Sequence, residues 1–231
     1  MQSPDRGIVE LEGGRLILVD KPAGMTSHDV VDRIRRLTGE KRVGHAGTLD
    51  PMATGLLVVA VGRGATRTLA GGLEGGKRYL ATVQLGMASD TLDREGKHEI
   101  VAVPRLPRER IEQCLERIKG LGVQVPPMVS ALKRSGIALY KLARRGWWIE
   151  REARPVEITE CLLKTYEGDS LTLEIAGGGG LYVRSLVRDL GIMLGLPAAL
   201  SELRRTSVGP WCVEDAVTLE ELGTMSLEKQ A

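Results

Sequence analysis

One short stretch, GHAGTLDPMATG from Gly44 to Gly55, constrains this chain more than any other. Its glycines permit positive φ angles and a close approach of backbones. Pro51 fixes its own φ and keeps Asp50 out of the α region. An apolar run, LLVVAV, follows directly, so we expect a stiff, non-helical loop that presents one carboxylate beside a buried strand. Taken alone, the pattern is more typical of a turn aspartate before proline that caps a short helix at Ala53.

Composition excludes several classes of protein. With 231 residues the chain is one large domain or two small ones. Its three cysteines, Cys114, Cys161 and Cys212, are widely spaced and form no C-x-x-C pair, which argues against a disulfide framework or a zinc site. No apolar run is long enough for a membrane helix, and the first residues lack the apolar stretch of a signal peptide. We therefore expect a cytoplasmic protein with reduced thiols and no membrane partner.

Strands and short helices alternate along the chain. Residues 1–13 are polar and rich in glycine, which predicts a loose lead-in. Thr26 and Asp29 form a capping-box pattern at the start of a helix that Gly39 ends. Apolar spacing predicts strands at residues 16–19, 56–61 and 77–86, a hairpin turned at 167–169, and helices near 65–70, 111–118, 138–143, 182–190 and 218–222. This mixture indicates an α+β fold.

Positive charge is concentrated in one window. From residue 133 to 154 the chain carries a net charge of +5, whereas the remainder is slightly acidic at −3. Such an asymmetry is typical of a surface that binds a polyanion. Trp147 and Trp148 lie inside the window, and we expect at least one of them to pack into the protein. The basic residues are Lys133, Arg134, Lys141, Arg144, Arg145, Arg151 and Arg154.

Several strings together resemble the TruB family of pseudouridine synthases, which isomerise a uridine in the T loop of tRNA. They are DKPAGMTSHDVV (residues 20–31), GHAGTLDP, the Lys-x-Tyr at 77–79, QVPPMVSALKRSGIALYKLARRG (124–146), Tyr-Val-Arg at 182–184 and LRRTSVGPW (203–211). They occur in the family's order over roughly residues 12–222. Two departures are Ser89, where the family has threonine, and the run from Gly177 to Leu181, where the family more often has small polar residues and a threonine.

The resemblance implies the pseudouridine synthase fold, an α+β fold with a mixed, mostly antiparallel sheet flanked by helices and loops. It places a catalytic domain at residues 14–223, containing a basic RNA-binding segment at 124–154. Residues 1–13 precede this domain, and a tail of residues 224–231 follows it. Many members of the family also carry a C-terminal RNA-binding domain of the PUA type. This chain ends before there is room for one, so we expect that domain to be naturally absent or cut away.

The resemblance also implies roles for individual residues. Asp50 matches the essential catalytic aspartate, Arg184 matches the arginine that pairs with it, and Tyr79 matches a tyrosine that stacks on the target base. His45 matches a histidine that we expect to fill the gap left when the uridine is flipped out. The further residues expected to contact RNA are Lys21, Tyr182, Lys133, Arg134, Arg144 and Arg145.

Pseudouridine formation breaks the N1–C1′ bond, turns the base and joins C5 to C1′. This isomerisation needs neither redox chemistry nor phosphate activation, so we expect no cofactor and no metal. The acidic turn with Asp90 and Asp93 lacks EF-hand spacing and a bidentate glutamate. The sequence leaves open whether Asp50 attacks C6, attacks C1′ or removes the C2′ proton.

The resemblance favours a tRNA pseudouridine synthase that acts as a monomer on the T arm without an obligate protein partner. Three alternatives to this hypothesis remain. One is the catalytic subunit of an RNA-guided pseudouridylation complex of the H/ACA type. Another is a tRNA-folding chaperone on the same fold. The third is a hydrolase with a single aspartate, but the chain shows no second carboxylate, metal cluster or histidine partner at suggestive spacing.

Overall fold

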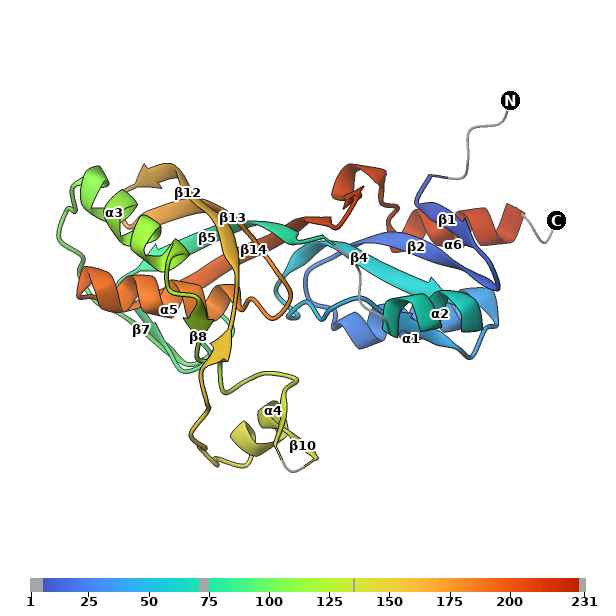
Figure 1. The fold of residues 1–231 in the computed structure, drawn as a ribbon, viewed down its shortest axis with the longest axis horizontal. Helices are drawn as coiled ribbons and strands as arrows, with labels where there is room; N and C mark the ends of the chain where they lie inside the picture. Colours follow the sequence, from blue (N-terminus) through green and yellow to red (C-terminus); the bar gives the residue numbers. More distant parts are fainter. Residues whose placement is uncertain (1–5, 71–74, 135, 229–231) are drawn as a thin grey trace. The chain divides into compact units, whose positions relative to one another are not determined.

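The structure is a computed structural model that describes residues 6–70, 75–134 and 136–228. The chain forms two compact units (Figure 1). The first unit comprises residues 1–78 and 204–231, and the second comprises residues 79–203. The predicted catalytic domain thus includes most of both units. Among the described residues, no helix is both long and apolar enough to span a membrane.

The first unit is built on an antiparallel set of strands. Strand β2 pairs with β4 from Arg15 opposite Val61 to Lys21 opposite Gly55. Strand β1 adds to β2, β3 adds to β4, and the end of β14 (Ala198–Val208) pairs in parallel with the start of β4. The elements are β1 (Ile8–Leu11), β2 (Gly14–Lys21), α1 (Ser27–Thr38), β3 (Val43–His45), β4 (Thr54–Val61), α2 (Arg63–Ala70), β15 (Trp211–Cys212), the 3-10 helix η1 (Val213–Asp215) and α6 (Leu219–Glu228).

Both faces of β2 and β4 are buried, as the apolar run of β4 predicted. Successive strand residues point to opposite faces. Ile17 and Val59 pack in one cluster with residues of α1 and α6. Leu16 and Val58 pack in another cluster that includes Ala65 of α2. The strand that follows the Asp50 loop therefore lies in the interior of its unit.

Local signals set the bounds of α1. Thr26 caps the helix, its side chain accepts from the Asp29 amide at 3.1 Å, and the Asp29 carboxylate accepts from the Thr26 amide at 2.8 Å. Gly39 ends the helix with φ +67°. The predicted capping box is confirmed. By contrast, the predicted loose lead-in is wrong for Ile8–Leu11, which form β1 because Val9 and Leu11 pack against the buried cluster of β2.

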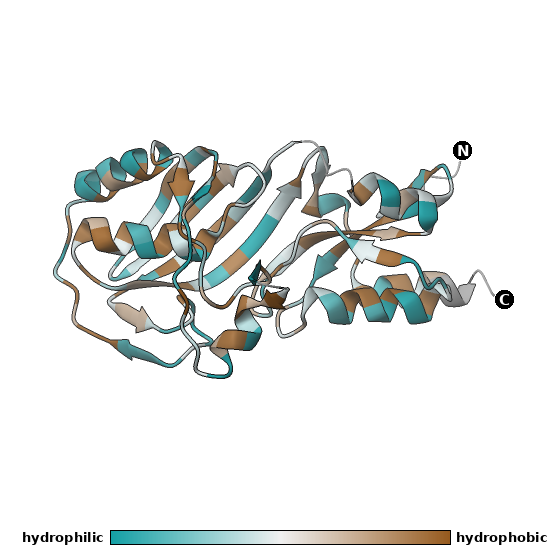
Figure 2. Cartoon of the chain, turned by 60° about the horizontal axis from the view of Figure 1, so that its bottom comes forward, coloured by the Kyte–Doolittle hydropathy of each residue, from teal (hydrophilic) through white to brown (hydrophobic). Residues whose placement is uncertain are grey.

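The second unit combines a sheet with two amphipathic helices. Its strands follow the order β14-β5-β13-β12, and the predicted hairpin between β12 and β13 is confirmed. Figure 2 shows hydrophobic and hydrophilic residues alternating along the helices. The elements are β5 (Lys77–Leu85), β6 (Met87–Ser89), β7 (His98–Ile100), α3 (Arg108–Lys119), β8 (Val123–Gln124), β9 (Lys133–Arg134), β10 (Ile137–Ala138), α4 (Leu139–Ala143), β11 (Arg154–Pro155), β12 (Ile158–Glu167), β13 (Ser170–Gly177), α5 (Val183–Leu194) and β14 (Ala198–Val208). The α+β prediction is confirmed.

Candidate active site

Asp50 lies in a non-helical loop between β3 and β4, as predicted. Its side chain is half-buried, and its carbonyl accepts from the Ala53 amide at 3.0 Å. Strand β4 begins at Thr54, so no helix starts at Ala53. Gly55 has φ +97°, and a Cβ there would lie 2.3 Å from the Arg205 carbonyl oxygen. Only glycine fits at this junction, which fixes the direction in which the loop enters the strand.

Lys21 supports this loop from inside the protein. Its side chain is fully buried. The ammonium donates to the carbonyls of Pro22 at 2.8 Å, Met25 at 2.7 Å and Pro51 at 3.2 Å. Pro51 directly follows Asp50, so Lys21 ties the Asp50 loop to the turn after β2. This position favours a structural role for Lys21 over the predicted contact with RNA.

Ser27 and Arg205 hold the loop at two further points. The buried Ser27 hydroxyl accepts from the Leu49 amide at 2.8 Å and donates to the Leu49 carbonyl at 3.1 Å. Arg205, only 1% exposed, donates to the carbonyls of Leu56 at 2.7 Å and Gly47 at 3.2 Å. Backbone on both sides of Asp50 is therefore anchored. Sequence reasoning missed both residues, although each lies in a string that resembles the family.

His45 lies on β3 opposite Val59 and is half-buried. Burial lowers the pKa of its imidazole, and the nearby positive charge of Arg205 lowers the pKa further. Its Nδ1 atom has no hydrogen-bond partner among the residues that the structure describes. A lowered pKa keeps the ring neutral at pH 7, and a neutral ring can stack on a base without adding charge.

Arg184 is buried in the first turn of α5, in the second unit. Its guanidinium donates to the carbonyls of Thr91 at 3.0 Å and Val129 at 2.9 Å. It also forms an ion pair with Asp93, with 3.5 Å between Nη1 and Oδ2. These contacts come from two separate segments, the loop with Thr91 and Asp93 and the segment with Val129, so the guanidinium is held in one orientation.

Asp93 belongs to a tight loop for which the sequence predicted only an acidic turn. Its carboxylate also accepts from the Thr91 hydroxyl at 2.5 Å and from the Glu95 amide at 3.0 Å. Leu92 has φ +65° and is the only non-glycine residue in the described chain with positive φ. The signal in the sequence was the string SDTLD at residues 89–93, which resembles the family apart from Ser89. The described residues contain no cluster of three or more potential metal ligands.

Both predicted aromatic contacts lie in or next to regular elements of the second unit. Tyr79 is buried in β5, where it alternates with Ala81 and Val83 as the pattern predicted. Tyr182 is half-buried at the N-cap of α5, and its amide donates to the Gln124 side chain at 3.0 Å. Their contacts with RNA stay predictions.

The basic segment, residues 124–154, has a small core of its own. Met128, Leu139 and Leu142 are buried together, with Ile149 packed against them. Figure 1 shows β10 and α4 of this segment apart from the sheet and long helices of their unit. Four cations that we predicted to contact RNA are all exposed: Lys133, Arg134, Arg144 and Arg145. The prediction that Trp147 or Trp148 packs inside is wrong, since each is 66% exposed.

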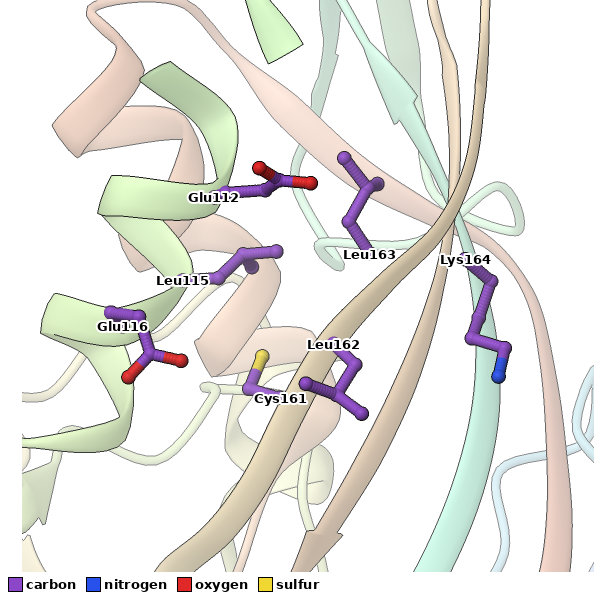
Figure 3. A pocket seen from close by; sticks show the side chains of 7 residues that line it. All are labelled: Glu112, Leu115, Glu116, Cys161, Leu162, Leu163 and Lys164. Carbon is purple, nitrogen blue, oxygen red and sulfur yellow. The ribbon is translucent and has the colours of Figure 1, made fainter. Parts of the chain in front are cut away.

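A separate pocket of about 470 Å³ lies between α3 and β12 (Figure 3). Burial raises the pKa of the Cys161 thiol in its wall to about 12. The thiol is therefore protonated at neutral pH and is a poor nucleophile. Glu112, on the α3 side of the pocket, is paired with Arg108, with 2.8 Å between Oε1 and Nε. This pocket offers no activated group for catalysis.

Two solved structures align with this chain over most of its length. The chain aligns with a structure described as a Cbf5-Nop10-Gar1 complex at 32% identity and a TM-score of 0.71, covering 91% of this chain and 54% of that one. It also aligns with an H/ACA RNP bound to a substrate RNA containing 2'-deoxyuridine, at 27% identity and a TM-score of 0.69, covering 100% of this chain and 61% of that one. The chain thus spans little more than half of these structures. The pseudouridine synthase fold is confirmed.

Two family models together match residues 35–231. Residues 35–183 match the N-terminal domain of the TruB family pseudouridylate synthases, and residues 184–231 match the tRNA pseudouridylate synthase B C-terminal domain. The tRNA pseudouridine synthase B of Desulfotalea psychrophila is 46% identical over 88% of this chain and 85% of that protein. The protein of the same name from Aromatoleum aromaticum is 46% identical over 93% of this chain and 70% of its own length. The chain belongs to the TruB family, and it is an isomerase of the pseudouridine synthase type.

Proposed function

We propose that this chain converts uridine 55 in the T loop of tRNA to pseudouridine, with Asp50 as the catalytic residue. The observation that carries the proposal is the Asp50 loop of a TruB-family chain, anchored from the interior by Lys21, Ser27 and Arg205. The names of the relatives support tRNA as the substrate.

The reaction is balanced without an external reagent. The N1–C1′ bond breaks, the base turns, and C5 bonds to C1′. C5 then loses its proton and N1 gains one. A carboxylate fixed near C1′, C2′ and C6 is the group that this sequence of steps needs, because it can act as a nucleophile or as a base. Asp50 is half-exposed on a stiff loop and meets that need.

Arg184 and Tyr79 are the proposed partners of Asp50 in catalysis, on the basis of their match to the family. A neighbouring arginine lowers the pKa of an aspartate by about 1–3 units and so keeps it ionised. The fixed orientation of the Arg184 guanidinium supports a role that depends on geometry. Tyr79 is proposed to stack on the target base and to assist removal of the C5 proton.

Base flipping gives His45 its proposed role. A uridine in a folded T loop must leave its stack to reach a carboxylate, at a cost of a few kcal/mol. A ring that takes the vacated place recovers part of this cost through stacking. His45 lies five residues before Asp50 in the same loop region, and its neutral ring suits this task.

The exposed cations of the basic segment are proposed to bind tRNA phosphates. Their exposure and the net charge of +5 support this assignment. Because these exposed cations belong to the same chain as Asp50, we propose that the protein acts as a monomer, without a guide RNA or an obligate protein partner.

A second candidate is supported by the solved structures. The likeness to Cbf5-containing complexes favours a subunit that works with partners and a guide RNA. The higher identity to proteins named tRNA pseudouridine synthase B, over most of their length, favours the stand-alone enzyme.

The test compares three RNAs with the purified protein in EDTA: unmodified full-length tRNA, its T-arm hairpin, and the same hairpin with a scrambled loop. We expect pseudouridine at position 55 of the first two at comparable rates and none in the third, because the T-loop shape is the recognised feature. Inactivity on both native RNAs until a guide RNA or a partner protein is added would support the second candidate instead.

A further inference from the structure

Trp147 and Trp148 form an unusual exposed pair on the second unit. The chain contains three tryptophans and no phenylalanine. Two of these three tryptophans are adjacent in sequence, and each is 66% exposed. Large aromatic side chains usually contribute to a core or to an interface, where their rings are buried. This pair therefore marks a surface that becomes covered by a partner.

The fold holds the pair outward through its neighbours on either side. The Trp147 amide donates to the Leu142 carbonyl at 3.0 Å. Two residues later, Ile149 packs against the small core of Met128, Leu139 and Leu142. Ile149 therefore contributes to this core, while the two tryptophans that precede it stay exposed.

Charge around the pair points to the chemistry of its partner. Arg144 and Arg145 immediately precede Gly146, and both are exposed. Arg144 already lies 5.6 Å from the ring centre of Tyr140, so guanidinium and aromatic groups share this surface. Guanidinium groups bind phosphates, and indoles stack on bases. A single-stranded nucleic acid offers a partner for both groups, a phosphate for the arginines and a base for the indoles.

We propose that Trp147 and Trp148 form a stacking surface for an unpaired nucleobase of the substrate RNA, distinct from the uridine that is isomerised. The base must be unpaired because a duplex hides the faces of its bases. The inference rests on the proposed function in that it takes the RNA substrate as given. It adds that affinity depends on a loop base held by these indoles as well as on phosphate contacts.

Tryptophan fluorescence tests the contact directly. In a Trp211→Phe background, Trp147 and Trp148 are the only tryptophans. Titration with the T-arm hairpin should quench their emission, whereas a fully paired duplex of equal length should quench it much less. Equal quenching by both RNAs would overturn the proposal, because the indoles would then respond to a helix and not to an unpaired base.

Substitution tests the contribution to binding. Trp147→Ala with Trp148→Ala should weaken hairpin affinity by about 5- to 150-fold, the effect of one lost base stack. The rate at saturating RNA and the salt dependence of binding should not change. Trp147→Tyr with Trp148→Tyr should bind within about threefold of the wild type, since tyrosine also stacks. Ile192→Ala is the matched control, an apolar side chain 71% exposed on α5, and should have no effect.

Unchanged RNA affinity in the double alanine variant would overturn the proposal, and it is the result expected if the pair serves a protein or a membrane. Failure of the tyrosine variant to restore affinity would also overturn it. A wild-type protein that binds the hairpin but forms no pseudouridine would refute the proposed function alone. A fully active wild type whose double alanine variant binds equally well would refute only this inference.

Discussion

The Asp50 loop and the basic segment both present charged groups, but the protein holds them in opposite ways. The cations around the Asp50 loop are buried, and their donors are bonded to backbone carbonyls. The cations of the basic segment are exposed on a small local core. Bond-making chemistry requires atoms placed within fractions of an ångström, whereas long-range attraction of phosphates tolerates mobile side chains. Changes in the loop should therefore alter turnover, and changes in the segment should alter binding.

The sharpest contrast comes from Asp50→Asn. Turnover should fall by more than about 100-fold, while tRNA affinity stays within about threefold, because we propose that the carboxylate acts in the chemical step. Single-turnover pseudouridine formation and filter binding measure the two quantities. Asp32→Asn, which removes an exposed carboxylate of the same unit, should change neither. Substantial turnover by Asp50→Asn would place the catalytic group elsewhere.

The reverse pattern is expected when four cations of the basic segment are replaced. Changing Lys133, Arg134, Arg144 and Arg145 to glutamine should weaken binding and flatten the plot of log K against log salt by roughly 0.7–0.9 for each lost phosphate contact. The rate at saturating tRNA should be kept. The control removes equal charge from other exposed positions of the second unit: Lys97, Arg105, Arg117 and Lys164. Equal slopes for both variants would show that the segment makes no phosphate contacts.

Arg184→Lys tests whether geometry matters more than charge in the interior. The ammonium cannot reproduce the planar set of bonds to Thr91, Val129 and Asp93. Turnover should fall by about 10- to 100-fold, because small displacements of catalytic groups are costly. Arg188→Lys on the same helix, where the arginine pairs with its neighbour Asp189, is the control. A wild-type rate in the Arg184→Lys variant would show that Arg184 only balances charge.

Lys21→Met separates a supporting lysine from one that contacts RNA. Loss of the ammonium removes three hydrogen bonds to the carbonyls of Pro22, Met25 and Pro51, so the free energy of unfolding should fall by about 1–3 kcal/mol. Urea unfolding measures this change, with the exposed Lys41→Met as control. The salt dependence of tRNA binding should not change. A flatter salt slope with unchanged stability would instead assign Lys21 to the RNA surface.

The smallest effect concerns pH. The pKa of folded His45 lies below its ordinary value of 6.5, so the unfolded chain binds this proton more readily. Stability contributed by neutral His45 is present above pH 6.5 and is lost as the pH falls toward the folded pKa. Wild type should therefore lose stability relative to His45→Gln between about pH 7.5 and pH 5, as measured by urea unfolding. A flat difference between wild type and His45→Gln would argue against a buried neutral ring.

The sequence by itself determined the elements whose causes are local. Thr26, Asp29 and Gly39 fix both ends of α1 through contacts within a few residues. The apolar run after the Asp50 loop fixes a buried strand, because its residues must be covered on both faces. The motif strings also indicated the family, since catalytic groups are encoded at fixed spacing in the chain.

The tertiary structure alone decided which groups meet across long separations. Lys21 bonds the carbonyl of Pro51, 30 residues away, and Arg184 bonds that of Thr91, 93 residues away. Nothing local to Lys21 distinguishes a lysine that contacts RNA from one that is buried. Likewise, only the tertiary structure shows that Ile149 packs against a small core while Trp147 and Trp148 stay exposed. Burial and hydrogen-bond partnership depend on the packing of distant segments, which no local pattern specifies.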